Sequence, residues 1–240
     1  PPVVDDDPTV TLVDLRPAPD LKHVKCAGEK ELGKEFDAIH KTLSETKTEW
    51  TIRLNALKRF QALVLGSAHV GRFVPLTLRL REPLIAHVAD LRSAICREAC
   101  CVLFLLVHAL GTDFEPFAGA AIPVLFKLTF VTVQVVAESG YICARSIIQE
   151  CRTPKVLGYL LEQVNACHKQ NMLRWRCSQV LLLALQIFPS QVLERHAEGL
   201  EGAIRKCMDD ARDDTRLVGR SCYWALCDVF EERGARLFAR

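Results

Sequence analysis

The chain has 240 residues, half of them hydrophobic and a quarter charged, which is enough to bury the core of one large domain or at most two. Its 31 basic and 29 acidic residues give a formal net charge of +2, which argues against a broad nucleic-acid-binding surface. Only 7% of the residues are aromatic, so aliphatic side chains must fill the core. We therefore expect a folded chain that is not disordered overall and has no nucleic-acid partner.

Cysteine is frequent, with eleven residues, but its distribution does not suggest a disulfide framework. Most of the cysteines lie among apolar residues in helix-like runs, and there is no CxxC pair or Cys/His cluster with zinc-ligand spacing. We expect reduced, buried thiols and a cytoplasmic location. The Pro-Pro start without a signal peptide suggests a piece of a longer protein.

Residues 1–27 are predicted to be an extended, acidic and proline-rich lead-in, and residues 28–240 a single helical domain. The first helix is indicated by Leu32, Phe36, Ile39 and Leu43, which recur with the spacing of an amphipathic stripe. No run shows sustained alternation with period two, so the fold class is all-α. The helices are expected in pairs: 31–44 with 49–66, 72–88 with 91–110, 116–130 with 133–149, 154–167 with 171–187, and 191–208 with 214–231.

An arginine recurs near the start of the second helix in several pairs. These arginines are Arg97, Arg145, Arg176 and Arg220, and the intervals between them are 48, 31 and 44 residues. The mean interval is close to the period of HEAT or armadillo repeats. In such repeats each helix pair buries its apolar face against its neighbours. We therefore predict an α-solenoid of HEAT repeats with five visible pairs, and residues 235–240 are candidates for the start of a sixth.

The segment 118–137 is apolar enough to suggest a membrane span, but Pro123 interrupts it and Lys127 places a charge near its centre. We expect two consecutive buried helices there, a core helix at 99–110, and no membrane contact. Motifs for nucleotide binding, zinc proteolysis and serine hydrolysis are missing from the sequence, so neither an enzyme nor a cofactor is expected. The carboxylates at positions 209, 210, 213 and 214 are better explained by capping of the following helix than by a cation site.

The turns inside the helix pairs should line one edge of a solenoid, which is its natural contact surface. That edge would hold one aromatic residue and a row of basic ones: Trp50, Arg92, Lys169, Arg174 and Arg216. Taken singly, Trp50 fits a partly buried structural role and each arginine a solvated or capping role. Together they suit an acidic protein surface, because charge steers the encounter and arginine binds carboxylates in a bidentate manner. Trp175 and Trp224 lie in helix stripes and are predicted to be core residues.

These residues lie in stretches that resemble the TOG domain of the CLASP family of microtubule-associated proteins. The likeness runs from about Lys30 to Phe238. The first matching stretch is Glu49–Arg53, and the most specific ones are Asp90–Ser93, Arg97–Cys100, Leu193–His196 and Arg220–Trp224.

The resemblance implies a paddle of six HEAT repeats whose turns bind the αβ-tubulin heterodimer, and a protein that promotes rescue and suppresses catastrophe of microtubules. It implies a monomeric domain of a larger multidomain protein on cytoplasmic microtubules. It assigns tubulin binding to Trp50, Arg53, Arg92, Ser139, Lys169, Arg174 and Arg216, with Arg92 and Ser139 on the middle turns.

Three residues depart from the pattern that the family leads us to expect, because Glu138, Ala89 and Gln134 stand where neutral polar or basic residues are usual. Each makes the proposed edge less positive. The alternative is a TOG-like HEAT scaffold that binds a different protein partner and not tubulin.

Overall fold

The computed structural model describes residues 13–45, 47–166 and 169–238, and in these ranges the regular structure is entirely helical. The helices follow in order: α1 (Glu29–Ser44), α2 (Trp50–Ser67), α3 (Phe73–Leu78), α4 (Arg81–Val88), α5 (Ser93–Leu110), the short 3-10 helix η1 (Gly111–Phe114), α6 (Glu115–Leu128), α7 (Gln134–Glu150), α8 (Pro154–Asn165), α9 (Asn171–Ile187), α10 (Ser190–Arg195), α11 (Ala197–Met208), α12 (Asp213–Val229) and α13 (Glu231–Phe238).

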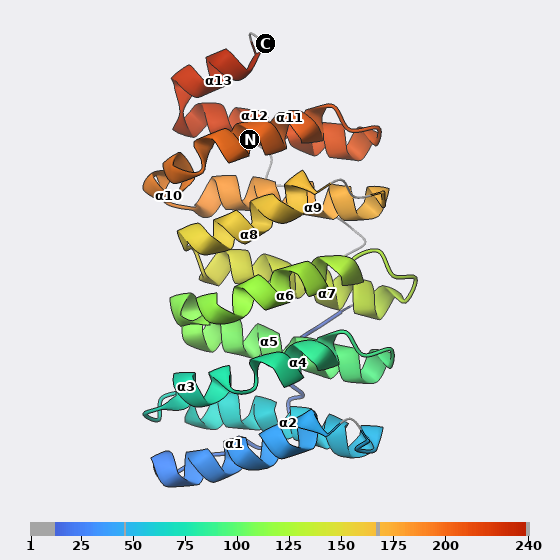
Figure 1. Ribbon diagram of the computed structural model, residues 1–240, viewed down its shortest axis with the longest axis vertical. Coiled ribbons are helices and arrows are strands. Elements are labelled where there is room, and N and C mark those ends of the chain that lie inside the picture. Colours follow the sequence, from blue (N-terminus) through green and yellow to red (C-terminus); the bar gives the residue numbers. More distant parts are fainter. Residues whose placement is uncertain (1–12, 46, 167–168, 239–240) are drawn as a thin grey trace.

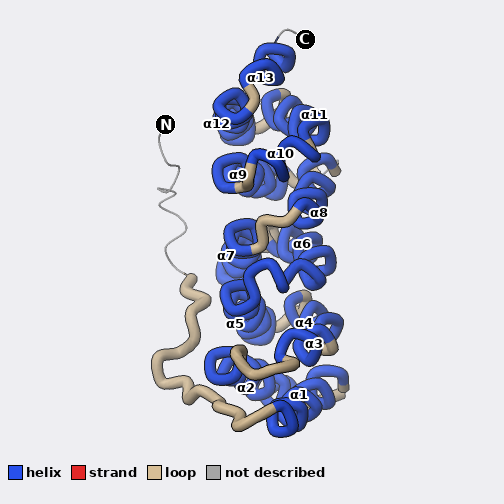
Figure 2. Tube along the Cα trace, turned by 90° about the vertical axis from the view of Figure 1, so that its left-hand side faces the viewer, coloured by secondary structure: helices blue, strands red, loops and turns tan. Residues whose placement is uncertain are grey.

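The helices stack in two layers along one long axis (Figures 1 and 2). One layer holds α2, α5, α7, α9 and α12, and the other holds the helices that precede each of them in the chain. All five predicted pairs are present, so the all-α solenoid of HEAT-type repeats is confirmed. Two of the predicted first helices are each divided into two shorter helices.

The division between α3 and α4 follows from Pro83. Proline in a helix interior removes a hydrogen bond and clashes with the carbonyl four residues earlier, here that of Arg79. The helix α3 ends at Leu78, with Arg79 as its C-cap, and Pro83 lies in the first turn of α4, where no intrahelical donor is needed. The break at Pro83 therefore lets a proline lie inside the second repeat without loss of a helical hydrogen bond.

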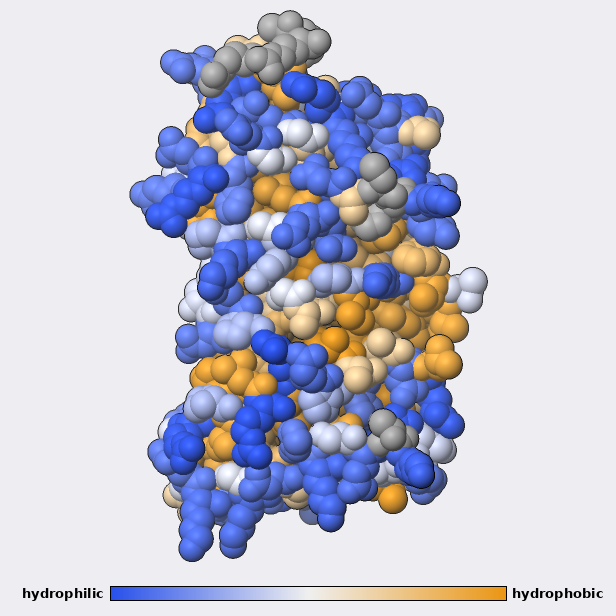
Figure 3. Space-filling view, viewed as in Figure 1, coloured by the Kyte–Doolittle hydropathy of each residue, from blue (hydrophilic) through white to orange (hydrophobic). Residues whose placement is uncertain are grey.

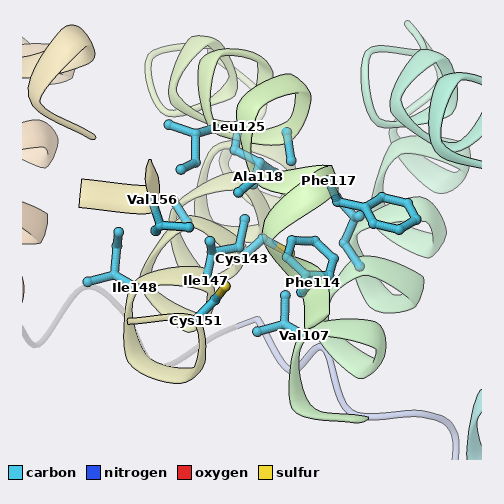
Figure 4. Packing of buried hydrophobic residues seen from close by; sticks show 14 of the residues in the cluster. Val107, Phe114, Phe117, Ala118, Leu125, Cys143, Ile147, Ile148, Cys151 and Val156 are labelled. Carbon is cyan, nitrogen blue, oxygen red and sulfur yellow. The ribbon is translucent and has the colours of Figure 1, made fainter. Parts of the chain in front are cut away.

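The core is continuous between the two layers. Figure 4 shows its middle, where buried side chains of α5, η1, α6, α7, α8 and the turn between α7 and α8 pack together: Val107, Phe114, Phe117, Ala118, Leu125, Cys143, Ile147, Ile148, Cys151 and Val156. The ten cysteines of the described residues are free thiols, and all of them except Cys227 are buried. This agrees with the prediction of reduced cysteines used as small hydrophobic residues.

One stretch, Ser93–Leu128, is long and apolar enough to cross a membrane by length and composition alone. It folds as α5, η1 and α6, and the chain turns between them at Gly111 with a φ of 53°. Just over half of its most apolar window, 56%, is buried inside the fold. As predicted, the apolar segment 118–137 is divided between two helices, α6 and α7.

Two tryptophans were predicted to be core residues, and the prediction for Trp224 is wrong. Trp224 lies in α12 with 65% of its area exposed, so the part of α12 that carries it is not covered by a neighbouring helix. Trp175 is half-buried, with the guanidinium of Arg176 4.8 Å and that of Arg212 4.9 Å from its ring.

Residues 13–28, here called the strap, precede α1 without forming a helix and run along the layer that contains α2 and α5 (Figure 2). Residues 1–12 of the predicted lead-in lie outside the described residues, and the domain boundary at residues 27 and 28 remains a prediction.

Candidate functional site

The turns inside the five helix pairs lie on one side of the molecule, the right-hand side of Figure 1. In the described part of the chain they comprise residues 45, 47–49, 89–92, 129–133, 166, 169–170 and 209–212, and we call this surface, with Trp50 at the start of α2, the loop edge. It forms because every first helix runs toward this side and every second helix runs back. The sequence-based expectation that these turns line one edge is met.

The first three turns of the loop edge expose large apolar side chains. Trp50, the first residue of α2, is 39% exposed, and Leu91 in the second turn is fully exposed. The third turn exposes Phe130, Val131 and Val133. Figure 3 shows hydrophobic surface reaching the right-hand margin at mid-height, where α6 joins α7. Contiguous apolar surface with a polar rim is typical of a protein-binding site.

Of these residues the sequence pointed only to Trp50. The signal for the others was present as a run of apolar residues, Phe130–Val133, in a turn, where polar residues are usual. The expectation of two consecutive helices in the segment 118–137 already placed a turn here, but it did not use the apolar side chains of that turn. Its position between two helices makes it an exposed apolar turn.

Two of the predicted binding arginines hold the turns in place. Arg53 donates from Nη1 to Oδ2 of Asp90 at 2.7 Å, and Arg174 donates from Nε to Oδ2 of Asp210 at 2.6 Å. Each arginine is the fourth residue of its helix, and each aspartate lies in the turn of the next pair. The side chains of Arg53 and Arg174 are only 14% and 21% exposed. Both guanidinium groups therefore join adjacent repeats.

The two aspartates have lowered pKa values. Burial alone would raise the pKa of Asp210, but hydrogen bonds from Arg174 and from the backbone N–H of Arg212 outweigh it. Burial would also raise the pKa of Asp90, but hydrogen bonds from the backbone N–H of Arg92 and from the side chain of Arg53 outweigh it and lower the pKa. Both carboxylates remain ionised at neutral pH and keep the arginines paired.

The last turn is also neutralised internally. Arg216 donates from Nη1 to the carbonyl oxygens of Asp210 and Ala211, at 2.8 and 3.0 Å, and pairs with Asp213. Arg212 pairs with Asp214 at 2.6 Å. Asp213 and Asp214 lie in the first turn of α12, where the helix dipole favours negative charge. Within the described residues no group of three His, Cys, Asp or Glu residues is placed to hold a metal.

The placement of Ser139 on a middle turn is wrong. Ser139 lies in the second turn of α7 on its buried face, and its Oγ donates to the carbonyl of Val135 at 2.6 Å. The neighbouring Glu138 is also buried, and its Oε1 accepts from Nη2 of Arg176 at 2.8 Å. The negative charge of Glu138 therefore does not reach the loop edge.

Positive charge on the loop edge is accordingly sparser than the sequence suggested. Exposed cations that form no ion pair with any described residue include Lys47, Arg92, Lys127 and Lys169. Lys47, Arg92 and Lys127 lie within three residues of an exposed apolar side chain in the chain. The loop edge is thus an apolar surface with scattered cations. Of the predicted basic row, Arg174 and Arg216 form ion pairs within the fold, whereas Arg92 and Lys169 are exposed.

Comparison with known proteins gives the family. Residues 32–240 match the model described as CLASP N terminal. The chain is 37% identical over 222 residues to the CLIP-associated protein of Arabidopsis thaliana and 32% identical over 225 residues to CLIP-associating protein 1 of Xenopus tropicalis. These alignments cover 91% and 93% of this chain but 15% of each relative, so the chain spans a small part of the length of those proteins.

Solved structures show the same fold at low identity. A protein from work on tubulin recruitment by microtubule polymerases with TOG domain arrays is 19% identical, with a TM-score of 0.67 over 82% of this chain and 41% of that one. A crescerin TOG domain, from work on microtubule regulation in the primary cilium, is 18% identical with a TM-score of 0.61 over 85% and 83% of the two chains. The match of almost the whole chain to the family model, together with these relatives, shows that the chain belongs to the CLASP N-terminal family and has the helical-repeat fold of TOG domains.

Proposed function

We propose that this domain binds αβ-tubulin through its loop edge, as part of a larger CLASP-like regulator that promotes rescue and suppresses catastrophe of cytoplasmic microtubules. The family membership supports the class of protein. The observation that carries the proposal is the set of exposed apolar side chains on the first three turns. Large apolar side chains that are exposed on adjacent turns of a free solenoid indicate a surface that a partner protein covers, because burial in the complex removes them from water.

Trp50 and Leu91 are the central contacts in this proposal. Aromatic and large apolar side chains at the centre of an interface supply most of its binding free energy. Arg92 and Lys169 lie on the same edge, are exposed, and steer the domain toward an acidic partner. Arg53, Arg174 and Arg216 act by holding the turns in register.

Size-exclusion chromatography of the domain with unpolymerised tubulin tests the proposal. We expect the domain to co-elute with tubulin and Trp50→Ala to weaken binding by roughly 30-fold or more, the effect of removing an interface hot spot of about 2 kcal/mol. Trp224→Ala is the matched control, because Trp224 is the more exposed of the two tryptophans and lies away from the loop edge. Equal effects of the two substitutions, or no co-elution at all, would favour a scaffold that binds another protein.

A further inference from the structure

The strap is fixed to the C-terminal half of α2 by hydrogen bonds of its own backbone groups to the backbone of Ala62 and the side chain of Ser67. Val24 donates its N–H to the carbonyl of Ala62 at 2.9 Å. Ser67 donates from Oγ to the carbonyl of Val24 at 2.7 Å and accepts from the N–H of Cys26 at 2.9 Å. A Cβ at Gly66 would stand 2.1 Å from the carbonyl oxygen of Val24, so this anchor requires glycine at that position.

A second anchor fixes the other end of the strap to α5. Arg97 donates from Nη2 to the carbonyl of Asp14 at 2.9 Å and from Nη1 to Glu98 at 3.0 Å. Glu98 also accepts from Nε2 of Gln61 on α2 at 2.6 Å. Leu15, beside Asp14, is buried. One hydrogen-bonded network thus joins α2, α5 and the strap.

Between the anchors the strap stands away from the helices. A cavity of about 720 Å³ separates residues 16–22 from Lys58 and Gln61 on α2 and from Glu98 and Cys101 on α5. The strap therefore holds the two helices at two points, and its middle contributes little packing. A link of this kind restrains the distance and angle between α2 and α5.

These two helices carry the first part of the loop edge, since α2 begins with Trp50 and α5 follows the turn that contains Leu91. We propose that the strap is a positioning element for the partner site: it fixes α2 against α5 and thereby sets the spacing of Trp50 and Leu91. The inference rests on the proposed function of the loop edge. Gly66, Ser67 and Arg97 are its positioning residues, and none of them lies in a turn of that edge.

Gly66→Ala tests the proposal, with Gly33→Ala on α1 as the matched control, because a Cβ at Gly33 meets nothing within 4 Å. Hydrogen exchange of residues 13–28 shows whether the strap is released. The indole N–H resonance of Trp50 reports the first turn without tubulin. We expect faster exchange of the strap, a shifted Trp50 resonance and about fivefold weaker tubulin binding in Gly66→Ala, through lost preorganisation, with none of these in Gly33→Ala.

A second destabilised variant separates positioning from general stability. Gly219→Ala puts a Cβ 2.8 Å from the backbone of α11 in the last pair and should lower stability without moving the Trp50 resonance. The proposal is overturned if Gly66→Ala leaves strap exchange unchanged, or releases the strap while the Trp50 resonance stays in place. Weaker tubulin binding with an unmoved resonance also overturns it, since the strap would then contact tubulin directly. Because the resonance is read without tubulin, a failure of tubulin binding alone affects only the proposed function.

Discussion

Removing one partner of the ion pair between Glu138 of α7 and Arg176 of α9 should destabilise the domain far more than removing both. The two side chains are 9% and 6% exposed, and their atoms lie 2.8 Å apart. The guanidinium of Arg176 also lies 4.0 Å from the centre of the Tyr141 ring. The pair joins the second helices of two successive repeats directly behind the loop edge.

The magnitude follows from the burial of the charge that remains. Glu138→Leu leaves the Arg176 guanidinium in a site with little water, and breaking a buried pair in this way costs roughly 3–5 kcal/mol of unfolding free energy. In the double variant Glu138→Leu, Arg176→Met both charges are gone, together with the cost of desolvating them. We expect its free energy of unfolding to lie within about 1 kcal/mol of the wild-type value.

Urea denaturation followed by circular dichroism at 222 nm measures these differences for the wild type, the two single variants and the double variant. We expect the double variant to lose much less unfolding free energy than the sum of the losses in the two single variants. If each single variant lies within about 1 kcal/mol of the wild type, the pair is solvated and our account of the interface between α7 and α9 is refuted.

Three further predictions concern single residues. The pKa of Asp210 in the folded state lies below its ordinary value of 3.8. The stabilisation from its ion pair is therefore present above pH 3.8 and lost as the pH falls through the folded-state pKa. In denaturation series from pH 7 to pH 3, the difference in unfolding free energy between the wild type and Asp210→Asn should shrink as the pH falls. Burial raises the pKa of the Cys101 thiol to about 12, and of the ten described cysteines we expect only Cys227 to react with a thiol reagent at pH 8; rapid labelling of several others would contradict the packing. Gly140→Ala puts a Cβ 2.7 Å from a side chain of α6 and should lower stability by roughly 1–3 kcal/mol, whereas Gly202→Ala, in open space on α11, should raise it by about 0.5–1 kcal/mol; thermal melts of the two variants should move in opposite directions.

The pairs of helices were predictable because each helix buries one stripe, and the stripe repeats with the helical period. The break before Pro83 was not predicted, although the proline rule provides its cause. The contacts of the strap with α2 could not be predicted, since they use backbone groups of Val24 and Cys26 that no side-chain pattern reveals. On α2, Gly66 and Ser67 are the residues whose identity reflects that contact.

The position of the candidate site could be predicted from the sequence, but the roles of its individual side chains were harder to predict. The turn containing Trp50 was identified from the sequence because a tryptophan beside polar residues at a helix start is unusual. The role of Arg53 could not be inferred, because its partner Asp90 is 37 residues away in the chain and adjacent only in the fold. The exposure of Leu91 could not be predicted, because a single leucine in a turn belongs to no periodic pattern; it is fully exposed in the folded chain.

Hydrogen–deuterium exchange of the domain with and without tubulin is the measurement that tests the central claim most directly. We expect tubulin to slow exchange at residues 45–50, 89–92 and 129–133, where Trp50, Leu91 and Phe130 lie. The turns on the opposite side, at residues 68–72 and 151–153, should exchange at the same rate in both samples. Protection of the opposite turns, or of neither set when tubulin is present in excess, would contradict the assignment of the loop edge as the tubulin-binding surface.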